Sequence, residues 1–147
     1  MKIHLLLLTL FLVGPAMCVL QAEDPRKQSQ EETELEGKMN KMADAWRKLK
    51  RQVADGTKNA DSLQLLATIR AATEESAKLI PAKAADFSGV DHAKFVADFQ
   101  AKMKTLGDKF AQLEEALKAG RNDEAVKLTA EIGAMQKAGH KEFKRPE

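Results

Sequence analysis

The stretch FVADFQAKMKTLGDKFAQLEEAL, residues 95–117, decides the fold of this chain. Its large apolar residues return every three or four positions; they are Val96, Phe99, Met103, Leu106, Phe110, Leu113 and Leu117. Because an α-helix has 3.6 residues per turn, this spacing places all of them along one face. The stretch is therefore predicted to be a long amphipathic helix, which Gly120 ends.

Three further stretches show the same helical spacing, and each is followed by a residue that disfavours a continuing helix. The first stretch, residues 35–53, is followed by Gly56. The second, residues 59–80, is followed by Pro81, and the third, residues 122–143, by Pro146. Gly56 suits the left-handed position that follows a helix. Asn59 or Asp61 can begin the second helix, and Asn122 or Asp123 the fourth.

Four amphipathic helices joined by short polar turns cannot each bury an apolar face alone. Helices joined by short turns lie antiparallel to their neighbours. No stretch has the alternating β-branched pattern that is typical of strands. The predicted fold is an all-α, antiparallel up-down-up-down four-helix bundle, with neighbours crossing at about 20°.

The first 22 residues are expected to be a cleaved secretory signal. Lys2 precedes an apolar run at residues 5–13, which is shorter than the roughly 20 residues that span a bilayer. Gly14–Pro15 follows the run, and Ala22 is an acceptable residue before a cleavage site. The mature protein is therefore expected in the periplasm, with no membrane anchor.

The polar segment 23–32 is expected to be a flexible leader, which leaves 33–147 as the bundle domain. Cys18, the only cysteine, lies in the expected signal. A lipid anchor on it is a minor alternative, because Met17 occupies a position where lipidation needs a small residue. The mature chain would have no cysteine, which excludes disulfides, cysteine zinc sites, iron–sulfur clusters and a thiol nucleophile.

Charge and motifs argue against an enzyme and against a nucleic-acid binder. Acidic and basic residues nearly balance, at a formal net charge of +2, whereas nucleic-acid binders usually carry a strong basic excess. The chain has no Gly-rich phosphate loop, GxSxG or HExxH motif. Carboxylates such as Glu114–Glu115 fall on faces that are predicted to be exposed to solvent.

Two residues could together bind a metal in the bundle interior. Met39 lies on the apolar face of the first helix, and His140 lies close to that of the fourth, about one turn before its end. The first turns of helix one and the last turns of helix four meet at the same end of an antiparallel bundle. A thioether and an imidazole could then face each other there as two axial ligands of an iron.

Each of these residues also has an ordinary interpretation. A core methionine usually only fills space, and a histidine near a helix C-terminus often interacts with the helix dipole. Met42, three residues after Met39, is a second candidate for the facing sulfur.

The chain resembles the cytochrome b562 family in several short motifs. They are Leu35-Glu36-Gly37-Lys38-Met39, the run from Leu66-Ala67-Thr68-Ile69-Arg70-Ala71-Ala72 to Ile80-Pro81, the FxxxF pair Phe95 and Phe99, and Ala138-Gly139-His140-Lys141-Glu142-Phe143. The resemblance implies a b-type haem with Met39 and His140 as iron ligands, and with Phe95 and Phe99 lining it. It also implies an electron carrier rather than an enzyme.

The last helix is similar to that of cytochrome c′ as well, but it departs from that family's haem-attachment motif. Gln136 and Gly139 stand where CKACH has cysteines, so any haem here would be non-covalent. Gln136 also stands where cytochrome b562 is expected to have an arginine, which leaves Lys137 or Lys144 to pair with the haem propionates.

The leading hypothesis is thus an exported haem b electron carrier, a monomer or weak dimer that exchanges electrons with unidentified redox partners. A haem-free bundle that acts as a structural or binding module is the alternative. Gas binding at a five-coordinate iron is a third, if Met39 is not a ligand.

Overall fold

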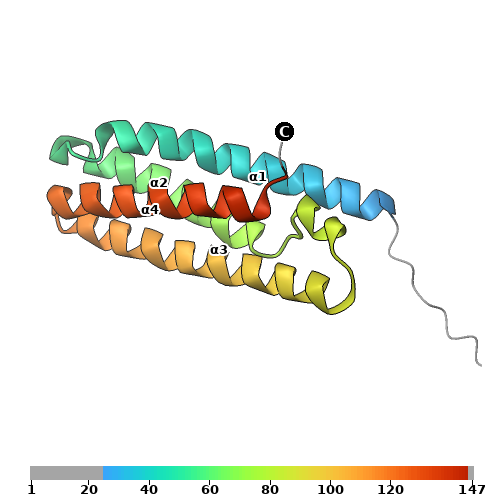
Figure 1. The fold of residues 1–147 in the computed structure, drawn as a ribbon. Helices are drawn as coiled ribbons and strands as arrows, with labels where there is room; N and C mark the ends of the chain where they lie inside the picture. The colour runs from blue at the N-terminus through green and yellow to red at the C-terminus, as the bar shows by residue number, and fades with distance from the viewer. Residues whose placement is uncertain (1–24, 146–147) are drawn as a thin grey trace, which may run out of the picture.

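The computed structural model describes the backbone of residues 25–145 and the side chains of residues 34–145. The expected signal, residues 1–22, lies outside this range. The elements are α1 (Pro25–Gln52), η1 (Gly56–Lys58), α2 (Asn59–Ser76), η2 (Ala82–Asp86), α3 (Gly89–Lys118) and α4 (Asn122–Phe143), where η marks a short 3₁₀ helix (Figure 1).

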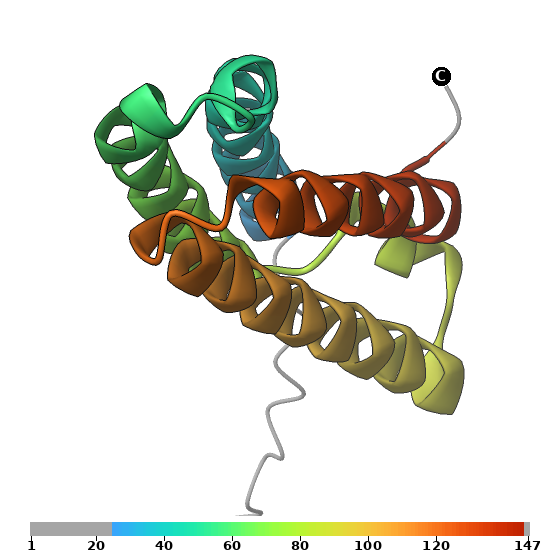
Figure 2. The same cartoon turned by 90° about the vertical axis from the view of Figure 1, so that its left-hand side faces the viewer.

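The four α-helices run alternately up and down (Figures 1 and 2). Helix α1 packs on α2, α2 on α3 and α3 on α4, whereas α1 and α4 are not a closely packed pair. The described residues include no strand. The predicted all-α, antiparallel four-helix bundle is confirmed.

Two of the expected helix boundaries differ from those observed. Helix α1 begins at Pro25, so most of the segment expected to be a flexible leader is helical. Helix α2 ends at Ser76 rather than near Ile80, because the N–H groups of Lys78 and Leu79 donate to carbonyls only three residues earlier, at 3.2 and 3.1 Å. The residue before a proline disfavours helical backbone angles, which explains why the helix stops short of Pro81.

The two glycines expected after helices differ in conformation. Gly120, which was predicted to end the third helix, follows α3 with a left-handed φ of +67°. Gly56 does not have a positive φ, so that prediction is wrong. Asp55 explains the difference: its carboxylate accepts a hydrogen bond from the N–H of Thr57 at 2.9 Å and starts η1 instead.

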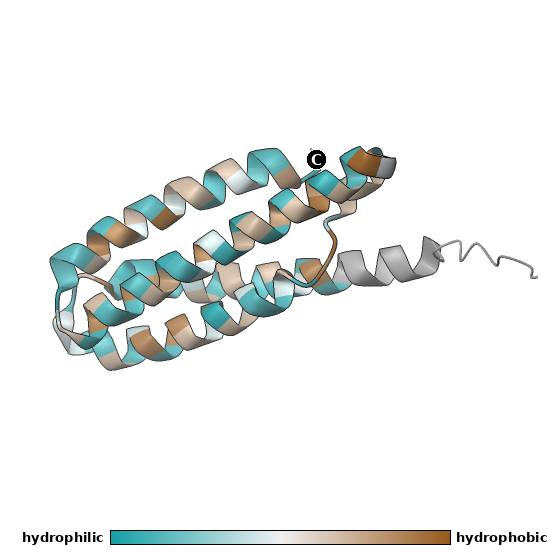
Figure 3. Cartoon of the chain, turned by 90° about the horizontal axis from the view of Figure 1, so that it is seen from below, coloured by the Kyte–Doolittle hydropathy of each residue, from teal (hydrophilic) through white to brown (hydrophobic). Residues whose placement is uncertain are grey.

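The apolar faces meet in two clusters of buried side chains. Hydrophobic and hydrophilic residues alternate along each of the helices that Figure 3 colours by hydropathy. The first cluster is the larger one and occupies the half of the bundle with the short turns; it includes Trp46, Leu49, Leu66, Ile69, Phe110, Leu113, Leu117 and Ile132. The second cluster contains Leu35, Phe99, Met103 and Phe143. This cluster lies at the end of the bundle away from the short turns. It includes Phe99, one of the candidate site residues, and Phe95 and Met39 pack against it.

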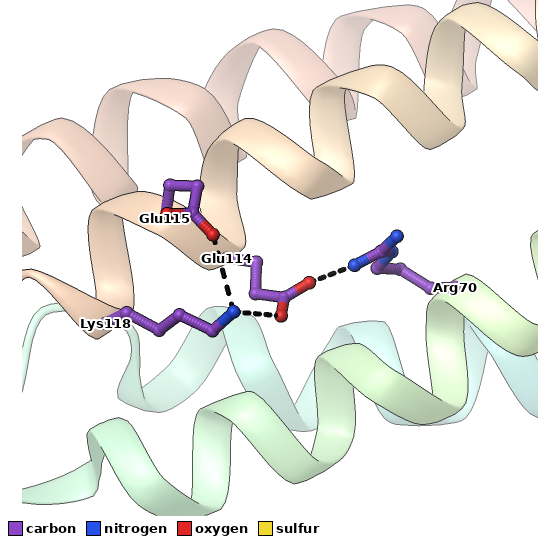
Figure 4. A network of polar contacts seen from close by, with 4 residues as sticks. All are labelled: Arg70, Glu114, Glu115 and Lys118. Carbon is purple, nitrogen blue, oxygen red and sulfur yellow. Dashed lines mark hydrogen bonds and ion pairs between the residues drawn. The ribbon is translucent and has the colours of Figure 1, made fainter.

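Glu114 is not the solvated carboxylate that the sequence indicated. It is half-buried and forms ion pairs with Arg70 of α2 and with Lys118, whose ammonium also reaches Glu115 at 3.4 Å (Figure 4). The ammonium of Lys118 and then the guanidinium of Arg70 hold the pKa of Glu114 below its ordinary value. This network links α2 to α3.

Two asparagine side chains join the ends of all four helices at the short turns. The amide of Asn122 donates to the carbonyl of Val53 and to the side-chain oxygen of Asn59, both at 2.8 Å. The amide of Asn59 in turn donates to the carbonyl of Leu117 at 3.1 Å. Both residues were expected to begin helices, and they do, but their side chains link neighbouring helices instead of capping their own.

Replacing Asn122 by alanine is therefore expected to lower the free energy of unfolding by about 1–3 kcal/mol, since the carbonyl of Val53 loses its partner. Urea unfolding of the protein, followed by circular dichroism, measures this loss. Asn40→Ala on the exposed face of α1 is the matched control. Equal stabilities of the two variants would show that the amide cluster contributes nothing.

Candidate functional site

Three of the four residues singled out in the sequence meet at the second cluster. Phe99 is one of its buried members, and half-buried Phe95 packs against it from the previous turn of α3. Met39 of α1 packs against both clusters, so it lies at the boundary between them. A methionine of α1 and two phenylalanines of α3 thus converge, as the family resemblance implied.

The two candidate sulfur atoms have different surroundings. Met42 is buried in the first cluster, and its Sδ lies 3.2 Å from the Oγ1 of Thr73, whose hydroxyl donates to the carbonyl of Ile69 at 2.8 Å. Met39 is half-buried. Since methionine has three rotatable bonds, a half-buried one can reorient its sulfur towards a ligand. Met42 is therefore a core residue, whereas Met39 lies at the edge of the core.

Aromatic rings extend the site beyond the predicted pair. Phe143, at the end of α4, is buried with its ring centroid 5.3 Å from that of Phe95 and 5.4 Å from that of Phe99, both edge-on. Phe87, just after η2, stacks on Phe95 at 4.7 Å and is exposed. Sequence reasoning placed Phe143 on the apolar face of its helix but gave it no role, and it missed Phe87, which lies in a segment without periodicity.

His140 lies one turn before Phe143 on α4, and its side chain is exposed. Within the part of the chain that the structure describes, the imidazole makes no hydrogen bond or ion pair, although its backbone carbonyl accepts from the N–H of Lys144. The structure therefore places His140 beside the cluster, not among its buried members.

The helix surface next to His140 has open space. Gly139 is half-buried, and a Cβ added to it would meet no other heavy atom within 4 Å. Gly133, six residues earlier on α4 and also half-buried, has equally open surroundings.

Two polar contacts hold the segment before α3 against the end of α4. The ammonium of Lys83 donates to the carbonyl of Glu142 at 2.6 Å, and Arg145 pairs with Asp86 at 3.1 Å. Lys137 and Lys144, the expected partners of propionates, are both exposed. The edge of the site is thus rich in basic groups.

The described side chains offer no cluster of three or more His, Cys, Asp or Glu residues that could hold a metal ion. None of the described helices combines the length and the hydrophobicity that a bilayer-spanning segment needs.

Comparison with known proteins places this site in a family. A family model described as Cytochrome b562 matches residues 34–144, a range that contains Met39, Phe95, Phe99 and His140. No curated protein and no solved structure matched the chain. The family consists of non-enzymatic haem-binding electron carriers. The match covers most of the chain, all of α2, α3 and α4 and much of α1, and this four-helix chain therefore belongs to the cytochrome b562 family.

Proposed function

We propose that the protein is an exported electron carrier that holds one haem b between α1 and α4, with Met39 and His140 as the axial ligands of its iron. The family supplies haem binding and electron transfer. The observation that carries the finer assignment is the pair of donors: a half-buried thioether on α1 and an exposed imidazole without a partner on α4.

The residues present fit such a group. A flat apolar ring needs space between two helices, and α1 and α4 are the neighbouring helices that do not pack closely. Gly139, next to His140, has no neighbouring atoms where a side chain would be. The aromatic edges of Phe95, Phe99 and Phe143 offer apolar contacts for the faces of a porphyrin.

When bound, the haem iron would supply a one-electron ferrous–ferric couple. The imidazole of His140 would donate nitrogen and the thioether of Met39 sulfur, and a thioether ligand raises the reduction potential. The phenylalanine rings would exclude water, which also tunes the potential. Basic side chains such as Lys137 and Lys144 would pair with the carboxylates of the haem at the edge of the site.

Two other functions remain testable against this one. A haem-free structural or binding module would purify without colour, since the second cluster would serve only as core. A gas-binding site at five-coordinate iron would bind carbon monoxide without losing a sulfur ligand, because Met39 would not occupy the sixth position.

The ligand assignment predicts a specific set of absorption spectra for the haem-loaded protein, residues 23–147. The reduced protein is expected to show the sharp bands of low-spin haem. His140→Ala should abolish them, because the anchoring nitrogen is lost. Met39→Leu should leave haem bound but convert the iron to a high-spin state, because leucine has a similar volume and no donor atom.

Met42→Leu is the matched control for Met39→Leu, because Met42 is buried in the first cluster, with its Sδ beside Thr73. It should retain the low-spin spectrum. A high-spin spectrum from Met42→Leu, with low-spin bands kept in Met39→Leu, would reverse the assignment of the sulfur ligand.

Export is the second part of the proposal and rests on residues 1–22. Expression of the full chain in a Gram-negative host is expected to yield a periplasmic product whose intact mass begins at Glu23. Replacing residues 5–13 with a polar segment of equal length should keep the protein in the cytoplasm. A full-length product in the cytoplasm of the unaltered chain would refute this prediction.

A further inference from the structure

One buried hydroxyl in the described part of the bundle has no hydrogen-bond partner. The Oγ atom of Ser76, the last residue of α2, belongs to a fully buried side chain. A buried hydroxyl without a partner costs free energy, because it has lost the hydrogen bonds that water gave it. An orphan of this kind calls for an explanation, such as a role in a site.

The pairing of α1 with α2 indicates which residue of α1 lies level with Ser76. Thr73, three residues before Ser76, places its Oγ1 3.2 Å from the Sδ of Met42. In an antiparallel helix pair, moving forward by three residues on one helix and back by three on the other keeps two positions level. Ser76 therefore lies level with Met39 along the helix pair, just as Thr73 lies level with Met42.

A salt bridge next to this level supports the same register. Lys38, the neighbour of Met39 in sequence, pairs with Glu75, the neighbour of Ser76, at 2.7 Å. Lys38 also pairs with Glu34 at 3.1 Å. The charged side chains cross between α1 and α2 on the outside, while Ser76 lies buried beneath.

We infer that Ser76 is a positioning residue for the sulfur of Met39: its hydroxyl donates a hydrogen bond to Sδ when that sulfur is turned towards the haem iron. The thioether has a second lone pair that can accept this bond. A donor to the sulfur withdraws electron density from the iron and so favours the ferrous state. This inference rests on the proposed haem ligation.

The bond has an expected effect on the reduction potential. A neutral hydrogen bond contributes on the order of 1 kcal/mol, which corresponds to roughly 3- to 10-fold in an equilibrium constant. Ser76→Ala removes the hydroxyl. It should therefore lower the ratio of the affinities of the Met39 sulfur for ferrous and ferric iron by roughly 3- to 10-fold. A tenfold change would lower the potential by 59 mV for a one-electron couple.

Thr73→Val is the matched control, since it removes a hydroxyl one turn away that contacts the sulfur of Met42 instead. It should leave the potential of the haem-loaded protein unchanged. Ser76→Cys, which keeps a weaker donor, should give a potential between those of Ser76→Ala and the unaltered protein.

A measurement without haem separates this role from a purely structural one. In the haem-free protein the hydroxyl is an orphan, so Ser76→Ala should unfold at the same or a higher urea concentration. The substitution is thus expected to lower the potential without lowering the stability of the haem-free bundle.

Equal potentials for Ser76→Ala and Thr73→Val, in protein that still has a low-spin spectrum, would overturn the inference while leaving the haem ligation intact. A loss of stability in haem-free Ser76→Ala would overturn it too, because the hydroxyl would then have a structural partner. A high-spin spectrum of the unaltered protein would instead refute the proposed function itself.

Discussion

The position of α4 relative to α1 is the constraint on which the rest of the structure depends. These helices are joined at one end by the hydrogen bond from Asn122 to the carbonyl of Val53, and at the other by the cluster that contains Leu35 and Phe143. Between these ends α4 packs on α3 and not closely on α1. A bundle closed along this side would have no room for a flat ligand between the two helices.

The same constraint divides the interior into two halves with different chemistry. The half near the short turns is closely filled by aliphatic side chains and by Trp46, whose ring meets Phe110 edge-on with centroids 5.7 Å apart. The other half brings together phenylalanine rings, the half-buried Met39 and the orphan hydroxyl of Ser76. The first half stabilises the fold, although the Nε1 of Trp46 there also has no hydrogen-bond partner, while the second half brings the aromatic rings and the half-buried sulfur together. This division is what a preformed cofactor site requires.

Much of the fold was predictable from the sequence, because apolar spacing reports directly on which face of a helix is buried. The stripe through Phe99, Phe110 and Leu117 and the left-handed Gly120 follow from local rules alone. The convergence of Met39 with Phe95 and Phe99 followed from the family resemblance, which named these residues as the lining of one site.

What the sequence could not provide is the register between helices. The pairing of Glu114 with Arg70 and the contact of Thr73 with Met42 join residues more than 30 positions apart. Gly56 was misjudged because the competing turn formed by Asp55 starts a 3₁₀ helix at that point. The stacking of Phe87 on Phe95 depends on the path of an irregular segment, which periodicity does not describe.

The central claim is that the sulfur of Met39 and the imidazole of His140 bind the same haem iron. The most direct test is the NMR spectrum of the reduced, haem-loaded protein with ¹³C-labelled methionine methyl groups. Of the four methionines in residues 23–147, Met39 alone should show a methyl signal shifted far upfield by the porphyrin ring current, and this signal should vanish in Met39→Leu. A shifted signal from Met42, or from none of them, would contradict the account.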